Sequence, residues 1–387
     1  MSNNFDAIII GAGITGASTA YHLKKNGVNR ILLLDRRGAA AGGTGKSAAI
    51  CRQHYSTSLM ARLALESISM MAEIEKEKAG SFFQSGYMML LPPTLIEAAA
   101  KNLELQQSVG VETRFLSKQE ITTMAPWLNT DGVAEVIFEQ LGGYADPVRI
   151  TEYFVHKFVE NGGEFRNDTP CRGLISETDR VAGVVLDSGP LHADIVVNAA
   201  GPWAPIIAKM AGIELEISAV REQDSIWQAR SNRPLPSVSI SNAVDSIYVR
   251  PMGENRFLIG QGFPKDYFDV DPYNFKQTAD DEFVNLILQR TSKRYPTLEG
   301  MQLISAYSAL YDVTPDWYPF IGPRSDINGY YDASGGSGHG FKIGPAVGKE
   351  LANWIVKGET SDDFSQLSYD RLAAQQLFIG AYGGNRG

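Results

Sequence analysis

The stretch FDAIIIGAGITGASTAYHLKKNGVNRILLLD, residues 5–35, decides the fold. Its apolar run at 5–10 predicts a strand, residues 14–26 predict a helix, and residues 31–34 predict a second strand. Strand, helix and strand in this order form a βαβ unit. The turn between the first strand and the helix matches the pattern G-x-G-x-x-G, with glycine at Gly11, Gly13 and Gly16.

Each of these glycines has a physical reason in a dinucleotide-binding turn. The first permits the tight turn, the second lets the backbone approach a pyrophosphate, and the third lets helix and strand pack closely. The helix start then meets phosphate charge. Asp35 stands nineteen residues after Gly16, at the end of the second strand, where it can accept hydrogen bonds from ribose hydroxyls. The whole set favours a dinucleotide site over an accidental turn.

Three later segments rich in small residues favour FAD as the dinucleotide. Residues 42–49, GGTGKSAA, can bring backbone amides close to a ligand, although a flexible surface loop is the alternative interpretation. An apolar strand at 194–197 ends in small residues. Residues 332–348 open a glycine-rich helix, whose first amides can face an electron-rich centre such as the N1–C2=O edge of a reduced flavin.

The rest of the chain predicts further helices and strands. Helical spacing favours helices over 59–78, 148–160 and 280–295. Strands are expected at 86–91, 171–175, 181–186, 193–197, 225–229, 246–250 and 256–260. We expect an α/β (α+β) architecture in which a cofactor domain is visited three times and is interrupted by a separate antiparallel sheet.

Composition narrows the class of protein. Net charge is −9 with no basic stripe, so nucleic-acid binding lacks its electrostatic footprint. No apolar run is long enough to span a bilayer, and the start of the chain lacks a secretory pattern. The two cysteines form no CxxC pair, and the histidines have no partners at metal-ligand spacing, which predicts no metal site and a cytoplasmic location.

Several motifs together carry a family resemblance. They are GAGITG at 11–16, NAAGPW at 198–203, DVTPD at 312–316, PFIG at 319–322 and GHGFK at 338–342. With these the chain resembles the D-amino acid oxidase superfamily, and within it the sarcosine oxidase and sarcosine oxidase β-subunit-like group. The resemblance implies a Rossmann-like FAD-binding domain of the glutathione reductase type, built from residues 1–82, 144–216 and 312–387. It implies an antiparallel-sheet substrate domain over 83–143 and 217–311.

The resemblance also implies an activity. A small secondary or tertiary amino acid, such as sarcosine, another N-methyl amino acid or proline, would lose hydride to flavin N5, and the imine would hydrolyse. Arg52 and Lys342 match positions that grip the substrate carboxylate, and Tyr248 and Tyr311 match aromatic walls. The alternatives are an arginine on FAD phosphate, a solvated lysine and core tyrosines. His54 either assists proton removal or makes a local hydrogen bond.

The same resemblance implies where FAD is held. The contacts are expected at Gly11, Gly13, Ile14, Thr15, Gly16, Asp35, Arg36, Gly43, Thr44, Lys46, Ser47, Ala48, Ala49, Cys171, Ala199, Ala200, Gly201, Trp203, Gly336, Ser337, Gly338, His339, Gly340, Phe341 and Lys342. Relatives that bind flavin covalently use a cysteine or a histidine at places where this chain has Ala309 and Ser47. Non-covalent FAD is therefore expected.

Two other functions stay open from the sequence. One is a glycine or D-amino acid oxidase, although Tyr311 stands where such relatives place an arginine. The other is a regulatory subunit that keeps the flavin fold without turnover. The electron acceptor, oxygen or a partner protein, is also open, as is a homo- or hetero-oligomeric state.

Overall fold

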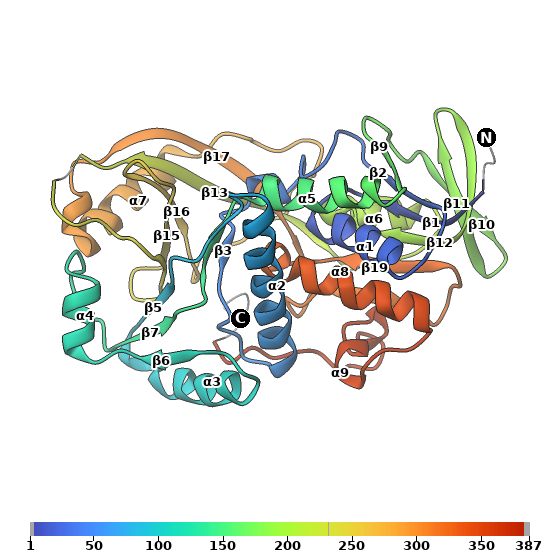
Figure 1. The fold of residues 1–387 in the computed structure, drawn as a ribbon. Coiled ribbons are helices and arrows are strands. Elements are labelled where there is room, and N and C mark those ends of the chain that lie inside the picture. The colour runs from blue at the N-terminus through green and yellow to red at the C-terminus, as the bar shows by residue number, and fades with distance from the viewer. Residues whose placement is uncertain (1–3, 231, 383–387) are drawn as a thin grey trace.

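The computed structural model describes residues 4–230 and 232–382, with one large sheet toward each end of an elongated molecule (Figure 1). The first sheet has eight strands taken from three separated stretches of the chain. They are β1 (Asn4–Ile10), β2 (Ile31–Leu34), β9 (Glu164–Arg166), β10 (Gly173–Glu177), β11 (Arg180–Leu186), β12 (Gly189–Asn198), β18 (Phe320–Pro323) and β19 (Tyr330–Ser334).

Five strands of this sheet run parallel, in the order β19, β12, β1, β2 and β9. Ile10 pairs with Asn198 on one side and with Leu34 on the other, and Asn198 pairs with Asp332. The carboxyl ends of four neighbouring strands therefore meet at one edge of the sheet. In open α/β sheets this edge is where ligands bind.

Both faces of the parallel strands are buried, as expected for a parallel sheet. Ala7 and Ile9 of β1 belong to the core formed with α1 (Ile14–Lys25) and α8 (Gly340–Lys357). Ile8 and Ile10 belong to the opposite core, with β10, β11 and α6 (Ala204–Lys209). The alternation of the strand thus assigns successive side chains to two different cores.

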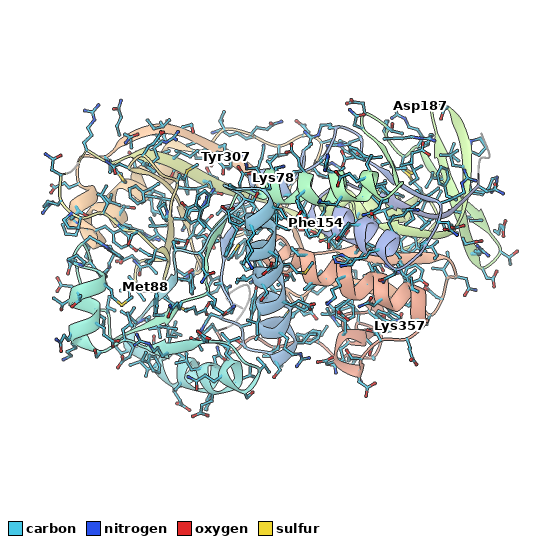
Figure 2. The ribbon with its side chains drawn as sticks, in the orientation of Figure 1. Lys78, Met88, Phe154, Asp187, Tyr307 and Lys357 are labelled. Atoms are coloured by element: carbon cyan, nitrogen blue, oxygen red, sulfur yellow. The ribbon has the colours of Figure 1, made fainter. Side chains whose placement is uncertain are left out.

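The first helix and the last long helix pack at very short range. A Cβ added to Gly344 would lie 2.7 Å from Ile14 Cγ2, and one added to Gly348 would lie 2.6 Å from Ser18 Cβ. The Ser18 hydroxyl donates a 2.8 Å hydrogen bond to the carbonyl of Pro345. Next to them, Phe154 of α5 (Pro147–Glu160) lies in the same core (Figure 2).

The second sheet also has eight strands, in the order β17, β13, β16, β15, β14, β5, β7 and β6. Met88 of β5 lies in its core, far from Phe154 (Figure 2). The bounds are β5 (Tyr87–Leu91), β6 (Thr113–Phe115), β7 (Glu135–Glu139), β13 (Ser218–Gln228), β14 (Ser239–Asn242), β15 (Ile247–Pro251), β16 (Arg256–Gln261) and β17 (Gln302–Val313).

This second sheet is mixed, where the sequence predicted an antiparallel one. All its pairs are antiparallel except β5 with β14, which are parallel. The reason is that β5 and β14 come from two different stretches of the chain, so no hairpin dictates their direction. Helix α7 (Asp281–Arg294) packs against this sheet, and Phe283 and Ile287 enter its core.

The remaining elements connect the two ends. Helix α2 (Ser58–Glu77) lies between the two large sheets (Figure 1). A small sheet pairs β8 (Gly143–Ala145) with β3 (Ile50–Cys51) and β4 (Phe82–Phe83). Helices α3 (Ile96–Ser108), α4 (Lys118–Met124) and α9 (Asp362–Ser365) complete the set. In the described part of the chain, no helix combines the length and apolarity that crossing a membrane requires.

Candidate functional site

One long cavity of about 470 Å³ begins at the carboxyl edge of the parallel strands and continues to the face of the second sheet. It starts beside Asp35, passes the glycine turn after β1, and reaches the beginning of α8. Side chains of β13, β15 and β17 line its other end. The cavity therefore joins the region expected to hold a cofactor to the region expected to hold a substrate.

The glycine turn leaves no room for side chains. Gly11 has a φ of +107°, and a Cβ there would stand 2.4 Å from the carbonyl oxygen of Ala199. A Cβ on Gly16 would stand 2.0 Å from the Gly11 oxygen. Gly16 does not line the cavity in the described residues and instead lets α1 approach the strands. The turn is thus held so close to β12 that only glycine fits.

Backbone amides hold the carboxylate of Asp35, the residue that follows β2. Asp35 accepts hydrogen bonds from the amides of Ala12 at 2.9 Å, Arg37 at 2.8 Å and Gly38 at 3.0 Å. The guanidinium of Arg36 lies 4.2 Å from the centre of the Trp203 ring and 4.9 Å from that of Tyr273. Cationic and aromatic groups thus form a stacked wall beside Asp35.

Residues 42–49 fold as a loop around the short 3-10 helix Thr44–Lys46 and line the middle of the cavity. The Thr44 hydroxyl accepts the amide of Ile14 at 3.2 Å, which ties this loop to the start of α1. The Lys46 ammonium donates to the carbonyl of Ser308 at 3.0 Å. This loop is therefore fixed on both sides rather than being a free surface loop.

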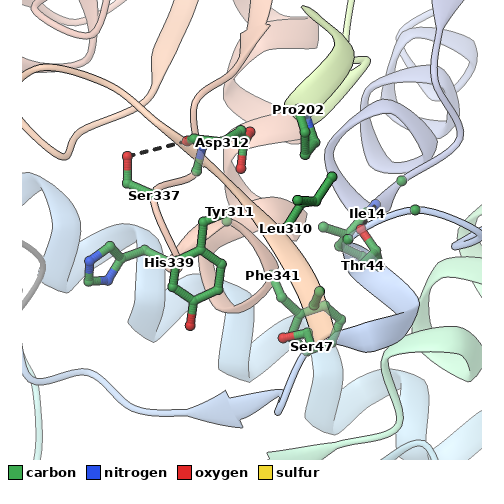
Figure 3. A pocket seen from close by; sticks show the side chains of 18 of the residues that line it. Ile14, Thr44, Ser47, Pro202, Leu310, Tyr311, Asp312, Ser337, His339 and Phe341 are labelled. Carbon is green, nitrogen blue, oxygen red and sulfur yellow. Dashed lines mark hydrogen bonds between the residues drawn. The ribbon is translucent and has the colours of Figure 1, made fainter. Parts of the chain in front are cut away.

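The glycine-rich segment before α8 is fastened to β17. The Asp312 carboxylate accepts the amides of Gly335 at 2.7 Å and Gly336 at 3.0 Å. A Cβ on Gly338, whose φ is +80°, would come within 2.6 Å of the Tyr311 ring. Figure 3 shows Tyr311 standing in the cavity wall between His339 and Phe341. The helix start is thereby aimed at the cavity.

The residues present fit an FAD molecule. The N-cap residues of α1 and α8 make no side-chain cap bond, and neither first turn holds an acidic residue, so no carboxylate of these first turns competes for the helix starts that line the cavity. At Gly340 a Cβ would meet nothing within 4 Å, which leaves open space in front of the α8 start. One helix start suits the pyrophosphate and the other suits the electron-rich edge of the flavin ring.

Arg52 and Lys342 come together in the cavity wall from opposite ends of the sequence. Arg52 follows β3, donates to the carbonyl of His54 and lies 4.7 Å from the centre of the Tyr55 ring. Lys342, in the first turn of α8, is only 9% exposed and donates to the Gly338 carbonyl at 3.3 Å. Burial and then the nearby Arg52 charge lower the pKa of Lys342 to about 7. Within the described residues, Lys342 has no carboxylate partner.

The wall formed by the second sheet contains acidic groups that the sequence did not indicate. Glu222 and Asp224 alternate on β13 and line the cavity together with Tyr248. Glu222 forms a buried ion pair with Lys265, and the Tyr248 hydroxyl donates to Asp224 Oδ1 at 2.8 Å. Glu222 and Asp224 stand at alternate positions, and this was the signal that the sequence offered. Acids in this pattern are, however, typical of a strand that faces solvent.

His54 is not brought into the cavity. Its Nε2 lies 2.8 Å from the Tyr382 hydroxyl, and its Nδ1 lies 3.2 Å from the amide of Gln106. Burial, followed by the charge of Arg52, lowers the pKa of His54 to about 3. Both ring nitrogens of His54 thus have local hydrogen-bonding partners.

Apart from Gly16 and His54, the residues singled out from the sequence all line the cavity. They are Gly11, Gly13, Ile14, Thr15, Asp35, Arg36, Gly43, Thr44, Lys46, Ser47, Ala48, Ala49, Arg52, Cys171, Ala199, Ala200, Gly201, Trp203, Tyr248, Tyr311, Gly336, Ser337, Gly338, His339, Gly340, Phe341 and Lys342. Eight separate segments thus converge on one space.

Comparison with known families and proteins agrees with this geometry. Residues 6–354 match the family model described as FAD dependent oxidoreductase, DAO. The chain is 24% identical over 378 residues to mitochondrial sarcosine dehydrogenase of Homo sapiens, covering 92% of this chain and 40% of that protein. It is 24% identical over 377 residues to the formaldehyde-forming 4-methylaminobutanoate oxidase of Paenarthrobacter nicotinovorans, covering 95% and 46%. The chain thus spans less than half the length of these two relatives.

Among solved structures, the chain is similar to L-proline dehydrogenase from P. horikoshii. The TM-score is 0.90 at 27% sequence identity, over 98% of this chain and 100% of that one. Glycine oxidase from Bacillus cereus ATCC 14579 has a TM-score of 0.77 at 21% identity, which supports the fold alone.

Proposed function

Because the chain belongs to the family of FAD-dependent oxidoreductases, we propose that it oxidises the C–N bond of a small secondary or tertiary amino acid, such as sarcosine, another N-methyl amino acid or proline. The similarity to sarcosine dehydrogenase and to L-proline dehydrogenase supports this substrate class. FAD supplies the chemistry by accepting a hydride from the carbon next to nitrogen. The protein binds and orients the substrate and keeps water away.

The pair of cations in the cavity is the observation that carries the proposal. Arg52 and Lys342, which we call the carboxylate clamp, sit together in the wall beside the α8 start. A guanidinium forks onto a carboxylate, and an ammonium adds a point charge. The charge of Arg52 opposes that of the buried Lys342, and an anionic ligand would relieve this repulsion. An amino acid substrate supplies that anion.

The two tyrosines shape the space above the clamp. Tyr311 packs against Gly338, whose carbonyl accepts the Lys342 hydrogen bond. Burial keeps the pKa values of Tyr248 and Tyr311 well above those of ordinary tyrosines, so both stay neutral and able to donate hydrogen bonds. They would wall the carbon skeleton of the substrate and exclude water, which strengthens the clamp's electrostatic attraction.

FAD is proposed to bind without a covalent bond. Both Ser47 and Ala309 line the cavity, at the two places where relatives would carry an attaching histidine or cysteine. Neither a serine hydroxyl nor a methyl group forms those flavin bonds. Cys51 is fully buried in the core and Cys171 belongs to the segment after β9, near the Asp35 end of the cavity.

An anaerobic screen tests the function. The purified holoenzyme is mixed without oxygen with sarcosine, N,N-dimethylglycine, L-proline, glycine and D-alanine, and loss of the flavin absorbance is followed. Bleaching by the first three is expected. Bleaching only by glycine or D-alanine would favour an amino acid oxidase of the other type. A flavin that no compound reduces would favour a regulatory subunit. Admitting air, or an electron-carrying dye, to the reduced enzyme then identifies the class of acceptor.

A further inference from the structure

The acidic wall of the cavity faces the same space as the clamp. Asp224 is 5% exposed, and its Oδ1 accepts the Tyr248 hydroxyl. Its second oxygen, Oδ2, accepts no hydrogen bond from the residues that the structure describes. Two cations act on this carboxylate: Lys265, whose ammonium is engaged by Glu222, and Arg250. Asp224 is thus a cavity-lining carboxylate that forms no ion pair of its own in the described chain.

The fold makes room for this carboxylate. Gly260 of β16 stands opposite Asp224 in the sheet, and a Cβ there would lie 2.6 Å from Asp224 Oδ1 and 2.2 Å from the Tyr248 hydroxyl. Any larger residue would displace the pair. The absence of a side chain therefore lets a tyrosine and an acid meet at the cavity surface.

A short series of contacts leads from the acid to the clamp. Tyr248 donates to Asp224, and it lies close enough to Tyr311 for the two hydroxyls to raise or lower each other's pKa. The Tyr311 ring lies against Gly338, and the Gly338 carbonyl accepts Lys342. Arg52 and Lys342 thus line one part of this wall, and the Asp224 carboxylate, which forms no ion pair within the described residues, lines another. A zwitterionic amino acid, with its carboxylate on the clamp, matches this arrangement of charge.

We propose that Asp224 receives the substrate's ammonium group and takes its proton, leaving the amine neutral for oxidation. The inference rests on the proposed function. In this step an N–H bond breaks, an O–H bond forms on Asp224 Oδ2, and the electron pair of the broken bond stays on nitrogen. The products are a neutral amine and a neutral carboxylic acid, and no oxidant takes part.

The surroundings suit Asp224 to this exchange. Burial raises its pKa to about 7, while the hydrogen bond from Tyr248 opposes the rise and the like charge of Glu222 adds to it. The charged and titratable groups facing it are Glu222 on its own strand, Tyr248 and Arg250 on β15, Tyr307 and Tyr311 on β17, and Lys265 after β16. Asp224 is ionised above about pH 7 and can then accept a proton.

The test compares an amine with its ether analogue, in which oxygen replaces nitrogen. The pairs are L-proline with tetrahydrofuran-2-carboxylate, and sarcosine with methoxyacetate. For each pH, the second-order rate constant of anaerobic flavin reduction by the amine is divided by the association constant of the ether, measured from the flavin spectrum. Both compounds carry a carboxylate, so titration of the clamp cancels in this ratio. In the unchanged enzyme the ratio should rise below about pH 7 and become level above it.

Asp224→Asn should remove the level region. The substrate must then enter already deprotonated, so the ratio should keep rising about tenfold per pH unit to pH 9, toward the pKa of the free amine. The affinity for the ether, which has no proton to give, should change less than about threefold. A ratio that becomes level near pH 7 in Asp224→Asn, or an ether affinity that falls as much as the amine rate, would overturn the assignment.

Two variants that keep Asp224 protect the test if Asp224→Asn does not fold. Tyr248→Phe removes the donor to the carboxylate and should move the rising part of the ratio to higher pH. Glu222→Gln removes a like charge and should move it to lower pH. An unmoved profile in both would refute the role of Asp224. If no amino acid reduces the flavin of the unchanged enzyme, the proposed function fails and this inference falls with it, whereas reduction with an unchanged profile refutes this inference alone.

Discussion

Replacing Lys342 by methionine removes the ammonium of the carboxylate clamp and keeps a side chain of similar length. Removing one partner of a desolvated charge pair costs about 2 to 5 kcal/mol. A carboxylate about 4 Å from an ammonium, at an effective dielectric constant of about 20, gives about 4 kcal/mol, which falls in this range. At about 1.4 kcal/mol per tenfold, the affinity for a carboxylate ligand should fall about 30-fold to 4,000-fold.

The pH dependence of binding gives a second, sharper readout. Lys342 has a pKa of about 7 without ligand, lowered by burial and by Arg52. A bound carboxylate favours the charged form and raises this pKa. Affinity is therefore fully present below about pH 7 and falls about tenfold per pH unit above it, until the pKa of the complex is reached. In Lys342→Met this decline should disappear.

The assay measures binding of tetrahydrofuran-2-carboxylate or methoxyacetate to the holoenzyme from pH 6 to 9, and flavin reduction by L-proline and by pyrrolidine, which has no carboxylate. Pyrrolidine should be nearly indifferent to the change. Lys349→Met is the matched control, because Lys349 is on the same helix but pairs with Glu66 at the surface. Equal losses with proline and pyrrolidine, or a pH decline that persists in Lys342→Met, would refute the clamp.

Three further outcomes are expected. Acid precipitation of the protein should leave a yellow supernatant, because Ser47 and Ala309 offer no covalent attachment; flavin that stays with the pellet would contradict this. Asp35→Ala should weaken FAD binding by about 1.5 to 3 kcal/mol, the value of a hydrogen bond to a charged group, and an unchanged FAD titration would remove Asp35 from the site. Arg371→Met should lower the free energy of unfolding by about 3 to 5 kcal/mol in urea, since it strands the buried Asp316 carboxylate that Arg371 contacts at 2.8 Å; an unchanged midpoint would show that the pair contributes nothing.

The sequence predicted the first βαβ unit closely. The strand, turn, helix and strand of residues 5–35 lie within one residue of their expected bounds at nearly every end. Local sequence patterns are sufficient there, because the glycines, the apolar run and Asp35 belong to elements that follow one another within a few positions. Helix α5 was found for the same reason, since the sequence Asn161-Gly162-Gly163 ends its apolar pattern.

The second sheet was harder to predict. Strand β17, twelve residues long, was missed because its first four residues are exposed and its later ones follow no simple alternation. Helix α4 had a usable signal, a capping box from Ser117 to Glu120, that the sequence interpretation did not use. The acids of β13 could not be assigned to a cavity from the sequence. The cavity that they line is enclosed by β15 and β17, which lie further along the chain.

Packing between elements that are far apart in the sequence also limits how early the protein can fold during translation. Helix α1 ends at Lys25 and its partner α8 begins at Gly340, so 340 − 25 = 315 positions separate them. At about 5 to 20 residues per second, translation takes roughly 16 to 63 seconds to cover that distance. During that interval the apolar face of α1 lacks its final covering, and a nascent chain is exposed to chaperones and to aggregation. Capture of the flavin is therefore expected to be among the last events of biogenesis, and flavin starvation should show first as loss of newly made protein.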